Sequence, residues 1–293
     1  MSYLRVTIEQ FGPEWRNVEA NVTRMESLVA ARPGADLIVF PELALTGYLL
    51  GGAAQDLALP LSSGSPLALE PGGPAVAFGM VELGSDQLVY NTAVLAQGGD
   101  VVASHRKIYL PTYGMFDEGR LFARGRQGVR PFDLTPDWRI GLLVCEDLWH
   151  PALAYLHAIQ EADVIVVLAA PPGRGLPEEG DENEFSSTEP WELLVRSTAF
   201  LHGVYVVLAC RTGVEASVMF SGGSMVADPT GTVVARAAEM EDARLEVTLD
   251  KEAIRRARAS FSHLRDEDPN LVQREIQRIA SRESAPRDGP DGS

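Results

Sequence analysis

Cys145 stands where a strand-like run of residues ends and a helix-like run begins. The apolar run 139–144 predicts a strand, and 151–162 predicts a helix with a proline near its first turn. A helix N-terminus or a nearby cation lowers a cysteine pKa from about 8.5, so this thiol is a candidate nucleophile. A buried structural cysteine is the alternative. Glu146 and Asp147 follow the sulfur directly and favour chemistry, because carboxylates are costly to bury beside a merely packed thiol.

A carboxylate and a lysine stand at comparable points. Glu42 follows the apolar strand-like run 35–40, and α/β sheets often carry their chemistry at such strand ends. Lys107 and Lys251 are the two lysines among 25 basic residues, the rest being arginine. A lysine ammonium is a compact donor that suits a small oxyanion, whereas the planar arginine guanidinium binds carboxylates through two hydrogen bonds. The number of lysines alone does not decide between a functional role for Lys107 and a lysine that is present by chance.

Three segments resemble the catalytic blocks of the nitrilase superfamily of carbon–nitrogen hydrolases. In chain order they are Val39–Tyr48, His105–Pro111 and Leu143–Trp149. The middle block continues to Arg120 in a form closest to the glutamine-amidase domain of glutamine-dependent NAD synthetases. The resemblance spans residues 1–250 and includes the shorter segments 90–92 and 220–231.

The resemblance implies a four-layer αββα sandwich with a triad of Glu42, Lys107 and Cys145. Cys145 would attack an amide carbon and form a thioester, which divides one difficult step into two. Glu42 would take the thiol proton, pass it to the departing amine and later activate water. Lys107 and the backbone N–H of Glu146 would stabilise the oxyanion. Glu118 would be a fixed acceptor that orients Lys107 or the substrate amide.

The surrounding pocket is less clearly defined. Tyr113 and Phe116 match the middle block and are expected to line the pocket, although core aromatics and a solvated loop carboxylate at Glu118 are ordinary alternatives. Ala170 stands where synthetase-type glutamine amidases usually carry a serine that helps to hold glutamine. A polar group buried without its partner costs about 1–3 kcal/mol, so whether glutamine is accepted is open.

The sequence therefore predicts a thiol amidohydrolase that cleaves a small linear carboxamide to a carboxylic acid and ammonia. N-carbamoyl-amines are a further substrate class. Nitriles are disfavoured, because the nitrilase branch usually has tryptophan in place of Glu146. A non-catalytic dimeric binding or regulatory protein is the alternative, and the intact triad argues against it. The substrate, its chain length and any synthetase that uses the ammonia stay open.

We expect neither a metal nor a cofactor. The five histidines and two cysteines show no metal-ligand spacing, and no phosphate-binding glycine motif is present. A protease-like pair of Cys145 with His150 or His157 is disfavoured, because the flanking residues differ. The loop 171–189 carries six carboxylates and is either a lid that repels anionic substrates or a solvated loop.

Strand-like and helix-like runs alternate and predict a layered α/β domain. Residues 1–250 are expected to form the hydrolase domain, and residues 251–293 a helical extension with a frayed tail from Ser284. Residues 49–74 are expected to be irregular, with at most one short helix. Strands are predicted at 4–8, 35–40, 75–82, 87–96, 100–105, 139–144, 163–170, 204–210, 223–227 and 232–236, and helices at 15–31, 151–162 and 191–202.

Charge and composition narrow the possible partners. With 25 basic and 41 acidic residues the chain has a net charge of −16, which disfavours nucleic acid and anionic membranes. Its apolar runs are far shorter than the roughly 20 residues of a membrane span. The start shows no signal-peptide pattern, and with two cysteines we expect a cytoplasmic protein. The expected partners are a small amide substrate and further copies of the chain, as a homodimer or larger oligomer.

Overall fold

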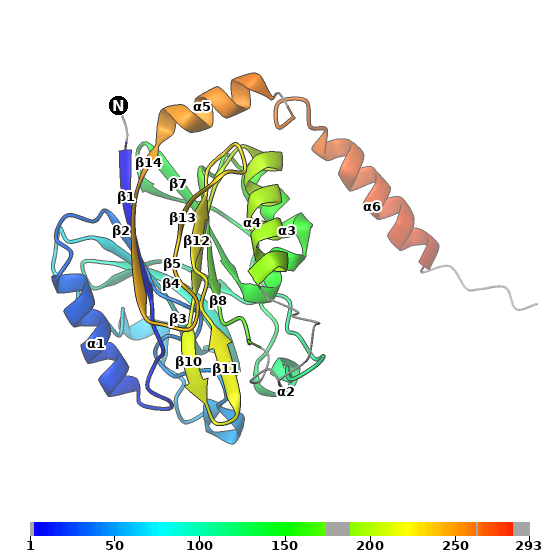
Figure 1. The fold of residues 1–293 in the computed structure, drawn as a ribbon. Coiled ribbons are helices and arrows are strands. Elements are labelled where there is room, and N and C mark those ends of the chain that lie inside the picture. Colours follow the sequence, from blue (N-terminus) through cyan, green and yellow to red (C-terminus); the bar gives the residue numbers. More distant parts are fainter. Residues whose placement is uncertain (1–2, 174–187, 262, 284–293) are drawn as a thin grey trace, which may run out of the picture.

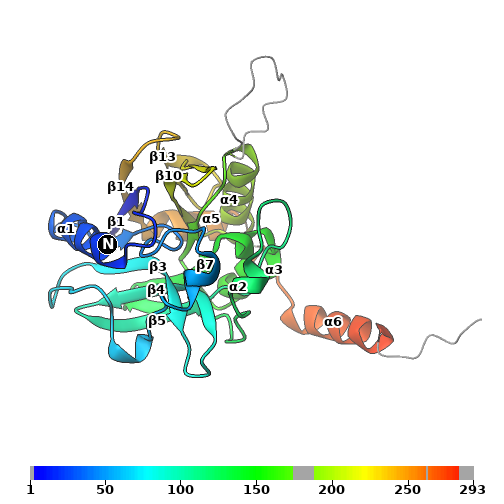
Figure 2. The ribbon, with the colours of Figure 1, turned by 90° about the horizontal axis from the view of Figure 1, so that it is seen from below.

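Two β-sheets lie face to face in the computed structural model, which describes residues 3–173, 188–261 and 263–283 (Figure 1). Within these residues each sheet has six strands, in the orders β14-β1-β2-β3-β4-β5 and β13-β12-β9-β8-β7-β6. Helix α1 covers the outer face of the first sheet, and α3 and α4 cover that of the second (Figures 1 and 2). The predicted αββα sandwich is therefore confirmed.

The elements have the following bounds. The first sheet contains β1 (Tyr3–Gln10), β2 (Leu37–Val39), β3 (Ala75–Leu83), β4 (Val89–Gln97), β5 (Asp100–Arg106) and β14 (Ala243–Asp250). The second contains β6 (Phe132–Thr135), β7 (Trp138–Val144), β8 (Val164–Ala169), β9 (Tyr205–Cys210), β12 (Met225–Ala227) and β13 (Val233–Arg236). A separate hairpin joins β10 (Thr212–Glu215) to β11 (Val218–Ser221). The helices are α1 (Val18–Ala30), α2 (Glu118–Leu121), α3 (Pro151–Ile159), α4 (Thr188–His202), α5 (Lys251–Ser260) and α6 (Pro269–Glu283), with 3₁₀ turns at Gly51–Ala54, Leu61–Ser63 and Cys145–Trp149. No described helix has the length and apolar character needed to cross a membrane.

Side-chain alternation in the first sheet separates two apolar layers. Leu37 and Val39 of β2 join the core between the sheets, whereas Ile38 between them joins the cluster beneath α1. Successive strand residues point to opposite faces, so each layer receives every second residue. Helix α1 supplies Met25 to the outer layer, and its first turn is capped by Asn17, whose side chain accepts from the Ala20 N–H at 3.1 Å.

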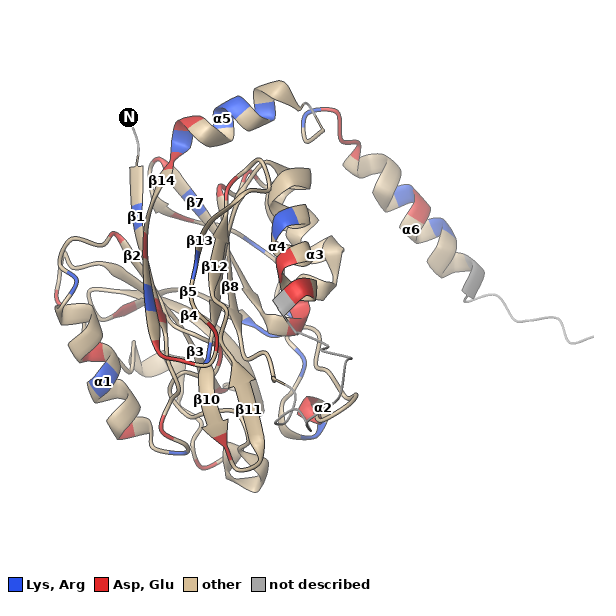
Figure 3. Ribbon diagram, in the orientation of Figure 1, with Lys and Arg blue, Asp and Glu red and all other residues tan. Residues whose placement is uncertain are grey.

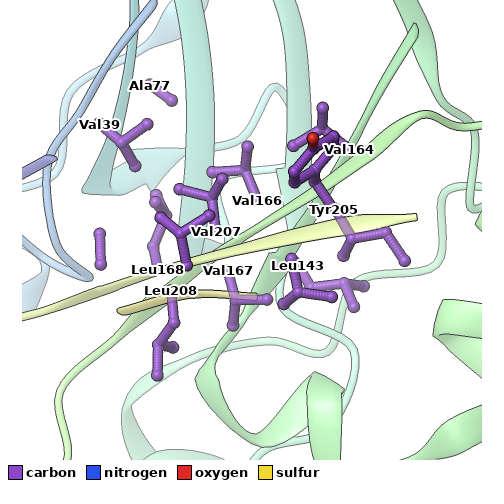
Figure 4. Packing of buried hydrophobic residues seen from close by; sticks show 14 of the residues in the cluster. Val39, Ala77, Leu143, Val164, Val166, Val167, Leu168, Tyr205, Val207 and Leu208 are labelled. Atoms are coloured by element: carbon purple, nitrogen blue, oxygen red, sulfur yellow. The ribbon is translucent and has the colours of Figure 1, made fainter. Parts of the chain in front are cut away.

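The central strands of the second sheet are apolar on both faces. Every residue of β8 and β9 is buried, because the first sheet covers one face and α3 and α4 cover the other. Figure 4 shows Val166 and Val207 in the same cluster as Val39 and Ala77 of the first sheet. Parallel strands buried on both sides form continuous apolar runs, which is how these two strands stand out in the sequence.

Elements with weaker sequence patterns were not predicted. These are β6, the β10–β11 hairpin and β14, whose burial alternates between partly buried and exposed residues until Leu249. Strand β14 pairs antiparallel with β1 along its whole length at the edge of the first sheet. Residues 49–74 are largely irregular, as predicted, but they contain two short 3₁₀ turns where at most one short helix was expected. Residues 174–187 of the acidic 171–189 loop, and the tail from Ser284, lie outside the described residues.

The two C-terminal helices differ in their contact with the sandwich. Helix α5 buries Ile254 and Ala257, and Arg258 donates to the carbonyls of Ala162 at 2.7 Å and Gly203 at 3.1 Å. Helix α6 projects away from the sandwich in both views (Figures 1 and 2), and its side chains from 269 to 281 are exposed.

His157 of α3 is a buried histidine with one clear role in packing. Its Nε2–H donates to the Leu142 carbonyl at 3.2 Å, and a Cβ at Gly141 would lie 2.6 Å from its ring. Burial and, to a smaller extent, the neighbouring His105 together lower the pKa of His157 to about 4. The folded protein therefore holds this imidazole neutral, whereas the unfolded chain protonates it below about pH 6.5.

We expect His157 to make the protein less stable as the pH falls from about 6.5 to 4, by about 3 kcal/mol in total, because only the unfolded state binds the proton. Urea unfolding of His157→Gln should show a smaller pH slope in this window than the parent protein. The exposed His263→Gln serves as the control and should keep the parent slope. An unchanged slope in His157→Gln would contradict this assignment.

Candidate active site

Three strand ends place the predicted triad at one end of the sandwich. Glu42 follows β2 and Lys107 follows β5 in the first sheet, and Cys145 follows β7 in the second. Glu42 and Lys107 are fully buried, and Cys145 is 7% exposed. Both charged groups act electrostatically on the Cys145 sulfur. The site therefore exists only where the two sheets face each other.

The Lys107 ammonium joins two carboxylates. Its Nζ lies 2.9 Å from Glu42 Oε1 and 2.6 Å from Glu118 Oε1, and Glu118 is itself 2% exposed. Burial alone would lower the pKa of Lys107, but the charges of Glu42 and Glu118 outweigh it and hold that pKa well above its ordinary value. Lys107 is therefore a permanent cation, and two of its three N–H donors are occupied.

Two further side chains, Asn91 and Tyr48, fix the carboxylates. Asn91 Nδ2 donates to Glu42 Oε1 at 2.8 Å, and the Tyr48 hydroxyl donates to Glu118 Oε1. Glu42 Oε2 is buried and has no hydrogen-bond partner among the described residues. Glu42 is thus held through one oxygen, and its second oxygen is available to take or give a proton.

Glu118 shares the cation with Glu42 and is affected by its negative charge. The pKa of Glu118 is raised to about 7. Burial is the largest cause and the Glu42 charge adds to it, whereas the Lys107 charge opposes the rise. One lysine cannot neutralise two buried carboxylates, so the cluster holds an additional proton over part of the neutral range.

The Cys145 thiol differs from the sequence-based expectation of a lowered pKa. Burial raises its pKa well above the ordinary value and the Glu42 charge adds to this, while Lys107 and the Ala170 N–H act in the opposite direction. The 3₁₀ turn that follows is only five residues long. Desolvation therefore outweighs the helix N-terminus, and attack by this sulfur requires a base that removes its proton.

Cys145 also has an unusual backbone conformation, with φ at +47°. A non-glycine residue in the left-handed region is held there by its surroundings, and such residues concentrate at functional sites. Glu42 lies in a similarly tight turn, where Leu43 has φ at +49°. A Cβ at Gly79 of β3 would lie 2.7 Å from the Glu42 Cα, so glycine is required for this turn to rest on the sheet.

A buried ion pair supports the loop that follows Glu42. Arg211 and Glu215 form a salt bridge with both side chains 1% exposed. Glu215 also accepts from the backbone N–H groups of Tyr48 at 2.9 Å and Leu49 at 2.8 Å. The Arg211–Glu215 pair therefore fixes the backbone that carries Tyr48, and with it the position of the hydroxyl that bonds to Glu118.

The expected pocket residues form a chain of contacts leading outward from Glu118. Phe116 makes edge contacts with Tyr48 at 6.2 Å and with Tyr113 at 5.6 Å between ring centroids. Tyr113 is 57% exposed, and its hydroxyl donates to Glu146 Oε2 at 2.7 Å. These residues connect the buried cluster to the protein surface.

Comparison with known proteins shows the family to which the chain belongs. The family model described as "Carbon-nitrogen hydrolase" matches residues 5–259. The chain belongs to the carbon-nitrogen hydrolase family. This hydrolase is 31% identical to a glutamine-dependent NAD(+) synthetase of Thermotoga maritima over 85% of its own length but only 42% of the synthetase, so it spans less than half of that relative.

Other relatives have about the length of this carbon-nitrogen hydrolase. A nitrilase of Pyrococcus abyssi is 29% identical over 82% of this chain and 87% of its own. The crystal structure of a carbon-nitrogen hydrolase from Helicobacter pylori has a TM-score of 0.78 at 22% identity and covers 94% of this chain and 99% of its own. An amidase from Nesterenkonia has a TM-score of 0.74 at 24% identity and covers 92% of this chain and 96% of its own. The solved structures show that the fold is shared.

Several contributors to the site were not assigned a role from the sequence. Asn91 and Tyr48 lie in segments that resemble the family, but nothing in their local pattern shows that they bond to Glu42 and Glu118. Arg211 and Glu215 lie at the end of β9 and in β10, far along the chain from Glu42. Among the described residues, no group of three or more potential ligands gathers in a way that could hold a metal ion.

We expect Lys107→Met to lower the free energy of unfolding by about 3–5 kcal/mol at pH 8, because two buried carboxylates then face each other without a cation. A buried carboxyl with a raised pKa favours the folded state only while it is protonated, so the loss should grow as pH rises through the raised pKa of Glu118. Denaturant titrations of the parent and of Lys107→Met at pH 5 and pH 8 measure this loss of unfolding free energy. Lys251→Met, which removes the other lysine, should not show this dependence. Equal losses at both pH values for Lys107→Met would contradict the arrangement.

Proposed function

We propose that the chain is a thiol amidohydrolase that cleaves the C–N bond of a small linear carboxamide. One observation carries the proposal. A permanent ammonium, Lys107, lies between two buried carboxylates, and Glu42 has a free oxygen in the electrostatic neighbourhood of the Cys145 thiol. A nucleophile, a base and an oxyanion donor are thereby assembled in one water-poor site.

In the first half-reaction, Cys145 Sγ attacks the amide carbon while Glu42 takes the thiol proton. The electron pair of the C=O bond moves to oxygen, where the remaining N–H of Lys107 and the backbone N–H of Glu146 stabilise the negative charge. The intermediate collapses, Glu42 returns the proton to the nitrogen, and ammonia leaves. A thioester on Cys145 remains.

In the second half-reaction, water attacks the thioester carbon and Glu42 takes one of its protons. The second tetrahedral intermediate expels the Cys145 sulfur, which recovers the proton from Glu42, and a carboxylic acid is released. Throughout both half-reactions, Glu118 continues to accept a hydrogen bond from Lys107. Since Asn91 and Lys107 hold one oxygen of Glu42, the same free oxygen serves every proton transfer.

Relatives support an amide as the substrate. In one structure of the Nesterenkonia amidase, the acetamide moiety of fluoroacetamide is covalently attached to the active-site cysteine. The synthetase relatives make glutamine a candidate, but Ala170 lacks the hydroxyl that would hold its amino-acid end. We therefore propose a linear carboxamide other than glutamine as the preferred substrate, with N-carbamoyl-amines as a second candidate class.

A non-catalytic binding or regulatory role is the main alternative. Binding alone needs no buried carboxylate oxygen without a hydrogen-bond partner, because such a group adds desolvation cost without a partner. The observed arrangement is therefore better explained by proton transfer than by ligand storage.

We expect the parent protein to release ammonia from one class in a panel of short aliphatic amides, ω-amides of dicarboxylic acids, glutamine, asparagine and carbamoyl-amines. Cys145→Ala should abolish turnover, since it removes the nucleophile. Cys210→Ala is the matched control and should retain it, because Cys210 is fully buried in β9 and takes no part in the mechanism. A folded parent that turns over none of these compounds would refute the amidohydrolase proposal.

We also propose that two copies of the chain associate through their exposed helical faces. Apolar side chains are exposed on α4, at Leu193 and Leu201, and on α6, at Leu271, Ile276 and Ile279. Figure 3 shows charged residues of both signs on the ribbon of α6. Burying such stripes against a second copy removes apolar surface from water.

We expect the parent protein to be a dimer by sedimentation equilibrium and the double variant Ile276→Glu/Ile279→Glu to be mainly monomeric, because two charges would enter the apolar stripe. Gln277→Glu adds a charge on the same helix outside the stripe and should leave the mass unchanged. A parent monomer, or a dimer unaffected by the double variant, would contradict the role of α6.

A further inference from the structure

Asp147 lies two residues after the proposed nucleophile and takes no part in the mechanism above. Its side chain is fully buried and accepts four hydrogen bonds. Oδ1 accepts from the backbone N–H groups of Ile108 at 3.1 Å and Tyr109 at 2.9 Å. Oδ2 accepts from the Val144 N–H at 3.2 Å and from His105 Nε2 at 2.8 Å.

These donors come from both sides of the active site. His105, Ile108 and Tyr109 surround Lys107 at the end of β5 in the first sheet. Val144 immediately precedes Cys145 at the end of β7 in the second sheet. One buried carboxylate thus bonds to the backbone on both sides of the gap between the oxyanion donor and the nucleophile.

We infer that Asp147 is a positioning residue that sets the placement of Lys107 relative to Cys145. The inference rests on the proposed function of those two residues. Strand pairing cannot set this placement, because β5 and β7 belong to different sheets and share no backbone hydrogen bonds. An ionised carboxylate is suited to it, since both oxygens only accept and each can accept twice.

An asparagine in this position cannot replace the carboxylate. Its amide nitrogen would face N–H donors in either orientation. With the nitrogen towards Val144, His105 can accept by moving its proton to the other ring nitrogen, but the Val144 N–H loses its acceptor. Asp147→Asn should therefore fold with its bonds to the Lys107 side kept and its bond to the Cys145 side lost.

Asp163 provides a matched control at the opposite end of the same strands. It is 4% exposed, accepts from the Arg139 N–H at 2.9 Å near the start of β7, and binds Lys251. Asp163→Asn also removes a buried charge from the second sheet. It changes stability without touching the segments that carry Lys107 and Cys145.

The test measures kcat, KM and the rate of Cys145 alkylation by iodoacetamide for the parent, Asp147→Asn and Asp163→Asn. The fully buried Cys210, whose pKa burial raises far above the ordinary value, does not compete for the reagent. We expect Asp147→Asn to lower kcat about 100-fold with KM nearly unchanged, as displacements of about 1 Å do. Alkylation should slow in parallel. Asp163→Asn should keep both rates.

Equal rates in the two variants would overturn the positioning role. Should Asp147→Asn fail to fold, His105→Ala removes one donor from the same oxygen and should lower the alkylation rate in the same direction, with no change refuting the inference. If the parent hydrolyses no amide, the proposed function fails, while the alkylation rates still decide the role of Asp147.

Discussion

The site depends on an ammonium that is buried between two carboxylates. Lys107 is enclosed with Glu42 and Glu118, and each of these three groups would be unstable in this position without the others. The cluster carries one cation and two acids, so it is not neutral unless a proton is also present. The pKa of Glu118 is raised because this carboxyl is buried and lies close to the second negative charge, that of Glu42. A site that stores and releases a proton near neutrality follows from the charge count.

Much of the surrounding structure serves to hold this cluster in place. Asn91 and Tyr48 each donate to one carboxylate, and the Arg211–Glu215 pair fixes the loop that carries Tyr48. Asp147 bonds to both sides of the gap between the sheets. Each carboxylate in the cluster keeps one oxygen without a partner among the described residues. Rigid support of one oxygen and freedom of the other suit proton transfer in a fixed geometry.

Burial has opposite consequences for the thiol and for the lysine. Both lose water, yet the two anions that face Lys107 hold its pKa well above the ordinary value. The pKa of the Cys145 thiol is raised chiefly by burial, and the Glu42 charge adds to this. The expectation of a lowered thiol pKa considered the helix N-terminus alone. That dipole acts only within about the first turn and is weaker than desolvation of a largely buried sulfur. The proposed mechanism therefore requires a base for this sulfur, and Glu42 is the group that we propose for it.

The sequence by itself determined the family and the layered α/β fold, and it proposed the residues of the triad. Apolar runs at β8 and β9 and the residue types around Glu42, Lys107 and Cys145 are local properties, and local properties can be read along the chain. The edge strand β14, the partners Asn91 and Tyr48, and three of the four bonds of Asp147 depend on segments far apart in sequence. Only the tertiary structure decided them, because a hydrogen bond between the ends of β5 and β7 exists only after two sheets have packed face to face. The pKa directions belong to the same class, since burial and neighbouring charge arise from that packing.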